Sequence, residues 1–275
     1  MKRITALTAG MVVAAIAAVS GATATAAGTL PTLALTMTGK SITATSSVPA
    51  GAVNVVSKVS GEGVGSPTLV RLDPGVTFAQ AFHAAISHGG DPNALDGLAS
   101  IVANPTAPKG TSNAQTVLTP GQYVALDTEA DNPSKWPHVN FEVTANSAPA
   151  SLAKPKATVA TQEFRFTGPQ TLRDGELVRY ENDGYLYHMV IALPAKNKAS
   201  AEDLNAALLQ GNQRKANKLV AGPPLQLMGS VGPGAMHQQV LNAKPGFYVL
   251  ACFMNTQDGR EHTRLGMERV IKIVK

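Results

Sequence analysis

The feature that most constrains the fold is an internal repeat. A strand-like run, a Pro-Gly pair and a second strand-like run occupy residues 117–124, and the same order recurs at residues 240–249. Each copy has a β-rich run further upstream, at 68–72 and at 188–193. Self-similarity of this length indicates two copies of one folding unit, each with a Pro-Gly hairpin before its final strand.

Each copy also carries one helix start. Thr77 and Ser200 are expected N-caps, because Gln80 and Asp203 follow them at the spacing of a capping partner. Aromatic residues make up only 5% of the chain, and the short alternating runs are separated by Gly and Pro turns. This pattern is typical of small β-sandwiches and not of a parallel sheet. The predicted fold class is therefore all-β, with two tandem sandwiches and one inserted helix in each.

A change of composition divides the two copies. Residues 146–160, NSAPASLAKPKATVA, are rich in Ala, Pro, Ser and Lys and lack periodicity, which is typical of a linker. We therefore expect one domain over residues 28–145, a linker over 146–160 and a second domain over 161–275.

The first residues carry the features of an export signal. Lys2 and Arg3 precede an apolar stretch and small-residue cleavage patterns, which predicts a signal peptide over residues 1–27. The mature chain is expected to be secreted or periplasmic, without stable membrane insertion, although an uncleaved N-terminal anchor stays open. Without Lys2 and Arg3 the basic residues number 21 against 18 acidic, so the net charge falls from +5 to +3. No basic run is interleaved with aromatics, so nucleic acid is not an expected partner.

Cys252 is the only cysteine, which excludes an internal disulfide. Outside the cytosol such a thiol is buried and inert, paired with another chain, or bound to a metal. Cys252, His262 and Met267 are spaced C-x9-H-x4-M before the last strand-like run. A thiolate, an imidazole and a thioether suit a trigonal copper site with a weak axial sulfur, provided that a second histidine joins them. His188 is the candidate, because it starts an apolar strand that can run beside the Cys252 strand.

This constellation resembles the cupredoxin family, which includes plastocyanin and azurin, over roughly residues 160–275. The resemblance implies a Greek-key sandwich and one type 1 copper ion held by His188, Cys252, His262 and Met267. It also implies outer-sphere electron transfer to a redox partner protein. The nine residues between Cys252 and His262 exceed the spacing of the small electron carriers, whereas the type 1 site of copper nitrite reductases has a comparably long loop.

The first copy is predicted to lack the metal. Alignment of the two copies places Asp127 opposite Cys252, Pro137 opposite Met267, and a position near Thr68 opposite His188. None of these residues rebuilds a thiolate-based site. Residues 28–145 are therefore expected to form a degenerate cupredoxin-like domain.

Other functions are weighed against this one. Catalysis is not expected, because Ala251 and Phe253 flank the cysteine and no His-x-His pair occurs. A copper chaperone or scavenger stays open, as does a metal-free exported binding or structural module. The metal-free module predicts that His188 or His262 turns away from the Cys252 sulfur. We further expect residues 228–234, with Leu265 and Gly266, to form an exposed patch around His262 where a redox partner docks, and His237 to be exposed.

Overall fold

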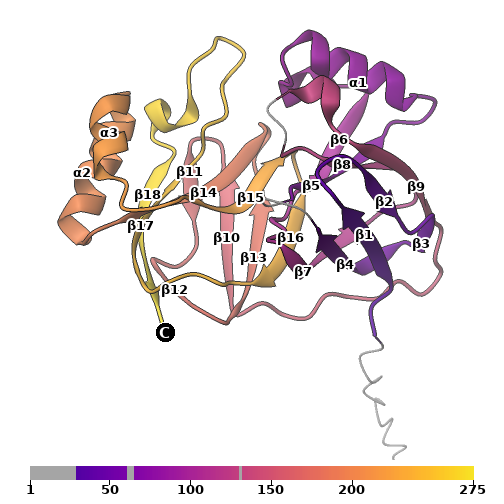
Figure 1. The fold of residues 1–275 in the computed structure, drawn as a ribbon, viewed down its shortest axis with the longest axis horizontal. Helices are drawn as coiled ribbons and strands as arrows, with labels where there is room; N and C mark the ends of the chain where they lie inside the picture. Colours follow the sequence, from indigo (N-terminus) through magenta and orange to yellow (C-terminus); the bar gives the residue numbers. More distant parts are fainter. Residues whose placement is uncertain (1–28, 61–64, 130–131) are drawn as a thin grey trace, which may run out of the picture.

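The structure, a computed structural model, describes residues 29–60, 65–129 and 132–275 (Figure 1). The predicted signal peptide, residues 1–27, lies outside these described residues. Within the described ranges, no helix is long and apolar enough to cross a membrane. The predicted all-β class, with two sandwiches of cupredoxin-like design, is confirmed by the order and pairing of the strands.

The two halves have the same order of elements. The first half contains β1 (Thr32–Met37), β2 (Ile42–Ala44), β3 (Ser47–Pro49), β4 (Gly51–Val59), β5 (Pro67–Leu72), α1 (Phe78–Ser87), η1 (Pro92–Leu95), β6 (Ala99–Ala103), β7 (Gly110–Leu118), β8 (Gly121–Asp127), η2 (Pro133–Lys135) and β9 (His138–Thr144). The second half contains β10 (Ala157–Gln162), β11 (Arg165–Thr167), β12 (Thr171–Arg173), β13 (Leu177–Asn182), β14 (His188–Ala195), α2 (Lys198–Leu209), α3 (Gln213–Leu219), β15 (Leu225–Val231), β16 (Met236–Val240), β17 (Gly246–Ala251), η3 (His262–Leu265) and β18 (Glu268–Val274).

Strand pairing repeats as well. β1 pairs with β2 and runs parallel to β4, and β10 pairs in the same way with β11 and β13. The sheet β3-β9-β8-β5-β6 of the first half has its counterpart in β12-β18-β17-β14-β15 of the second. The repeat read from the sequence is therefore a repeat of the whole topology.

One sheet runs through both halves. Its order is β11-β10-β13-β16-β7-β4-β1-β2, and the halves join where β16 pairs with β7. The Gln238 amide donates a hydrogen bond to Gln115 Oε1 at 2.9 Å across this junction. Because β7 and β16 are equivalent strands, the strand order of the sheet is symmetric about this junction. Figure 1 shows this shared layer in the middle of the molecule, with α2 and α3 at one end and α1 over the other half.

Three local expectations need correction. The predicted linker 146–160 overlaps β10, which begins at Ala157, because Val159 and Ala160 are buried in the sandwich. The second half has two helices, α2 and α3, where one was predicted. The N-cap of α2 is Asn197, whose side chain accepts from the Ser200 N–H, so the helix starts before Ser200. The Thr77 capping box of α1 is confirmed.

The Pro-Gly segments do not form hairpins. β7 lies in the shared sheet and β8 in a five-stranded sheet, so the chain at Pro120-Gly121 crosses from one layer to the other. In each half a tyrosine holds this crossing, because Tyr123 donates to the Thr119 carbonyl at 2.8 Å and Tyr248 to the Lys244 carbonyl at 2.7 Å. The turn residues were read correctly, but sandwich packing decides which sheet receives the next strand.

His237 is fully buried, so the expectation that it is exposed is wrong. It lies on β16, and its Nε2–H donates to the Leu227 carbonyl at 3.1 Å. Burial lowers the pKa of His237 from 6.5 to about 4. Between these two pH values the unfolded chain binds a proton that the folded chain excludes, so folding stability falls as the pH drops through this window.

We expect His237→Gln to flatten the pH dependence of unfolding. Glutamine keeps a donor for the Leu227 carbonyl but does not titrate. The wild-type protein should lose up to about 3 kcal/mol more stability than the variant between pH 6.5 and pH 4. Urea unfolding of both metal-free proteins across this range measures the difference. Equal slopes in the two proteins would contradict the burial argument.

Candidate metal centre

Three side chains from separate elements converge in the second half. His188 starts β14, Cys252 follows β17, and His262 opens η3. The Cys252 sulfur lies 3.4 Å from His262 Nδ1 and 3.8 Å from His188 Nδ1, and the ligand atoms of all three residues lie within 4.8 Å of one another. None of the three side chains is more than 1% exposed. The two rings therefore both face the sulfur, unlike the arrangement expected of a metal-free module.

These distances suit a shared metal ion. Bonds of about 2.3 Å to sulfur and about 2.0 Å to nitrogen place the two donor atoms about 3.5 Å apart in a tetrahedral site, and about 3.7 Å apart in a trigonal one. The observed 3.4 Å and 3.8 Å bracket both values. Both sulfur–nitrogen distances are thus compatible with one shared ion, and the choice between metals depends on ligand chemistry.

The two imidazoles present Nδ1 to the sulfur and bury Nε2. Neither His188 Nε2 nor His262 Nε2 has a hydrogen-bond partner among the described residues. A Cβ at position 184 would lie 3.1 Å from His188 Nε2, so Gly184 lets the chain pass close over this ring. The Nδ1 atoms are therefore the ones available to a shared ion, and the two Nε2 atoms point away from the sulfur.

Backbone hydrogen bonds connect the ends of the ligand loop. The Met189 N–H donates to the Cys252 sulfur at 3.4 Å. The Cys252 N–H donates to the Met267 carbonyl at 3.3 Å, and the Met267 N–H donates to the His262 carbonyl at 3.0 Å. Met267 is fully buried. The fourth predicted residue is therefore joined through its backbone to both Cys252 and His262.

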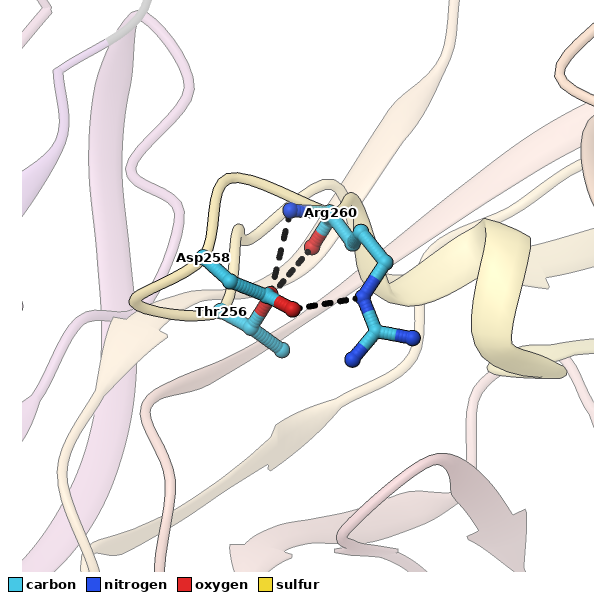
Figure 2. A network of polar contacts seen from close by, with 3 residues as sticks. All are labelled: Thr256, Asp258 and Arg260. Atoms are coloured by element: carbon cyan, nitrogen blue, oxygen red, sulfur yellow. Dashed lines mark hydrogen bonds and ion pairs between the residues drawn. The ribbon is translucent and has the colours of Figure 1, made fainter.

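The long loop between Cys252 and His262 folds back on itself. Asn255 and Glu261 form an antiparallel bridge, and the Thr256 N–H donates to the Arg260 carbonyl at 2.9 Å. The Asp258 carboxylate accepts from the Thr256 hydroxyl and from Arg260 Nε, the latter at 2.8 Å, and Figure 2 shows the contact with Arg260. The hydrogen bond from Thr256 is the main reason that the pKa of Asp258 is lowered. The extra residues thus form a closed turn, which returns His262 to the sulfur.

Burial keeps the cluster neutral when it holds no ion. It raises the pKa of Cys252 to about 12, against the opposing effect of the Met189 and Met254 backbone N–H groups. Burial lowers the pKa of His188 to about 3, with a further contribution from His262, and it also lowers the pKa of His262. At neutral pH both imidazoles have free lone pairs, and a bound cation must displace only the thiol proton.

The residue of the first half that is equivalent to Cys252 is polar, but it does not offer a soft sulfur ligand. Asp127 takes the place of Cys252, because its N–H donates to the Pro137 carbonyl at 3.0 Å as the Cys252 N–H does to Met267. The Ser66 N–H donates to the Asp127 carboxylate at 3.1 Å, as Met189 does to the sulfur. The residue opposite His188 is therefore Gly65, and the expected position near Thr68 is wrong. Strand register decides this correspondence, since Val70 pairs with Val124 as Leu193 does with Val249.

The expected docking patch at 228–234 is not exposed. Met228 and Val231 are fully buried, and only Pro233 and Gly234 are exposed in this run. The run belongs largely to β15, which packs against the first half: the Gly229 N–H donates to the Asn104 carbonyl at 2.9 Å. Its apolar, glycine-rich composition serves the contact between the two halves.

Comparison with known proteins gives distant matches to solved structures. No family model matches the chain, and no curated protein matches it. Auracyanin from Roseiflexus castenholzii is 17% identical, with a TM-score of 0.25, and the match covers 43% of this chain and 95% of that chain. The copper-containing nitrite reductase from Thermus scotoductus is 10% identical, with a TM-score of 0.26, and the match covers 89% and 68% of the two chains. A laccase from Botrytis aclada is 12% identical, with a TM-score of 0.26, covering 90% and 53%. Identities and TM-scores this low do not indicate what the chain binds. Its chemistry has to be inferred from the cluster itself.

Proposed function

We propose that the second half holds a single type 1 copper ion and that the protein is an exported electron carrier. The observation that carries the proposal is the convergence of the Cys252 sulfur with the Nδ1 atoms of His188 and His262 in one buried cluster. The same geometry would accept zinc, but a thiolate and two imidazoles, with the thioether of Met267, form the ligand set that favours copper. The thioether of Met267 is the fourth group that would hold the ion.

The chain's own residues would keep this site rigid. Copper in such a site supplies one-electron oxidation and reduction. The Met189 N–H supports the sulfur at 3.4 Å, and the bonds from Met267 to His262 and from Cys252 to Met267 hold the loop ends together. Because the ligands are buried in a packed sandwich, they would keep nearly the same positions in both oxidation states. A redox partner protein is proposed to dock on the surface near the ligands. Tyr185, which lies three residues before His188 and is 89% exposed, is a candidate contact.

Copper titration with visible spectroscopy tests this function. We expect one equivalent of cupric ion to give a strong thiolate-to-copper absorption in the red, which ascorbate bleaches and re-oxidation restores. A copper chaperone would instead bind cuprous ion and give no stable cupric band. A protein that stays colourless with cupric salt, or that takes up only zinc, would contradict the proposal.

A further inference from the structure

The two halves differ in how a helix covers the outer face of the five-stranded sheet. In the second half, α2 packs directly against β14 and β17, with side chains such as Leu204, Leu193 and Val249 all buried. In the first half, α1 covers the equivalent face of β5 and β8, but only Ala81 of this helix is fully buried. A cavity of about 280 Å³ lies beneath it. The same layer is therefore closed in one copy and hollow in the other.

One end of this cavity is apolar and largely aromatic. Phe78 and Phe82 reach it from α1 and stack on each other with their ring centroids 4.9 Å apart. Trp136, Leu126 and Ile101 also line the cavity. The stacked pair offers its outer ring faces and edges to an apolar group in the cavity.

The other end is polar, and it lies where the first half meets the second. Ser66 donates to the Asn104 amide oxygen at 3.1 Å and accepts from Thr128 at 3.2 Å and from Gln226 at 3.4 Å. All four line the cavity, and Ser66 and Asn104 are only 6% exposed. These hydroxyl and amide groups are neutral. The one charged side chain in the described lining, Glu129, already interacts within the protein.

We propose that this cavity binds a small, neutral, amphipathic molecule, with an apolar ring against the aromatic end and a hydroxyl or carbonyl group at the polar end. The volume lies just below the range of about 300–1,000 Å³ that is usual for ligand pockets, so a compact ligand of one or two rings fits it. Neutral lining groups disfavour a charged ligand, because burial of its charge would lack a partner. In the second half, side chains such as Leu204 close the equivalent layer, so the fold itself does not require this hollow.

The sole tryptophan makes this site directly observable. Trp136 lines the cavity and is the only tryptophan in the chain, so its fluorescence reports occupancy. We expect 2-phenylethanol to shift Trp136 emission in the full, metal-free chain and to saturate at one site, with the stoichiometry checked by calorimetry. Ethylbenzene, which lacks the hydroxyl, should bind roughly tenfold more weakly. Phenylacetate and 2-phenylethylamine, which are charged, should bind more weakly still.

Variants separate a built site from non-specific binding. Ala85 lines the cavity, so Ala85→Leu should fill it and weaken 2-phenylethanol binding at least tenfold, without lowering the thermal midpoint. His83→Leu changes an exposed residue of the same helix and should leave binding unchanged. Thr128→Val keeps the shape of the polar end, and it should weaken 2-phenylethanol but not ethylbenzene.

Several results would overturn the proposal. It fails if no probe gives a saturable change in Trp136 emission, or if Ala85→Leu folds and binds as the wild type does. It also fails if ethylbenzene or phenylacetate binds as tightly as 2-phenylethanol. Should Ala85→Leu not fold, Thr128→Val decides, because equal loss for both uncharged probes would leave the polar end without a role. Since copper is absent throughout, these outcomes are independent of the metal site.

Discussion

Cys252→Ser is expected to abolish the red absorption of the copper-loaded protein and to weaken copper binding by more than about 100-fold. Loss of a hydrogen-bond partner of a metal ligand alone costs about 10–100-fold in affinity, and this change removes the ligand itself. Serine has nearly the shape of cysteine, but its hydroxyl does not ionise under these conditions and is a hard donor. The two imidazoles would stay in place without the thiolate that gives the copper site its colour and its softness.

The measurement is a competition titration against a chelator of known copper affinity, followed in the visible range. Urea unfolding of both metal-free proteins checks that the variant is folded, since Cys252 is fully buried. His88→Ala serves as the matched control, because His88 is an exposed histidine at the end of α1, away from the cluster. A red band in Cys252→Ser, or an equal loss of affinity in His88→Ala, would exclude the assigned site.

Gly168→Ala is expected to destabilise the second half by about 4 kcal/mol. Gly168 has a φ of +104°, and a Cβ there would lie 2.1 Å from the Thr158 carbonyl oxygen. That oxygen belongs to β10, which lies between β11 and β13 in the shared sheet, so it cannot move aside without disturbing strand pairing. The Gly168 carbonyl also accepts from Arg269 at 2.8 Å, which ties this turn to β18.

Gly175→Ala is the matched control for this substitution. Gly175 also has a positive φ, of +81°, but nothing lies within 4 Å of a Cβ placed there. Only the cost of the left-handed backbone applies, which is about 1 kcal/mol. Urea unfolding of the two variants beside the wild type measures both effects. A similar loss of stability in both variants would mean that the backbone at Gly168 shifts freely, which would contradict its close packing against Thr158.

The candidate metal cluster was predictable because its signals are local and chemically specific. Cys252, His262 and Met267 belong to one loop, and His188 starts a strand whose apolar pattern marks it as buried. The convergence of His188, Cys252 and His262 required that β14 lie beside β17, as expected for the apolar strand that His188 starts. The position opposite His188 was missed by three residues, because a pairing register cannot be read from strand ends alone.

What the sequence by itself determined is the repeat, the all-β class, and the four residues proposed to bind the metal. Periodicity, turn residues and ligand types act over short stretches of chain, and they leave clear patterns there. Only the tertiary structure decided that β7 and β16 join the halves into one sheet, that His237 is buried, and that α1 stands over a cavity while α2 packs closed. Each of these depends on which surfaces meet across large distances in sequence, and a polar residue such as Gln115 looks the same in a sequence whether it meets water or Gln238.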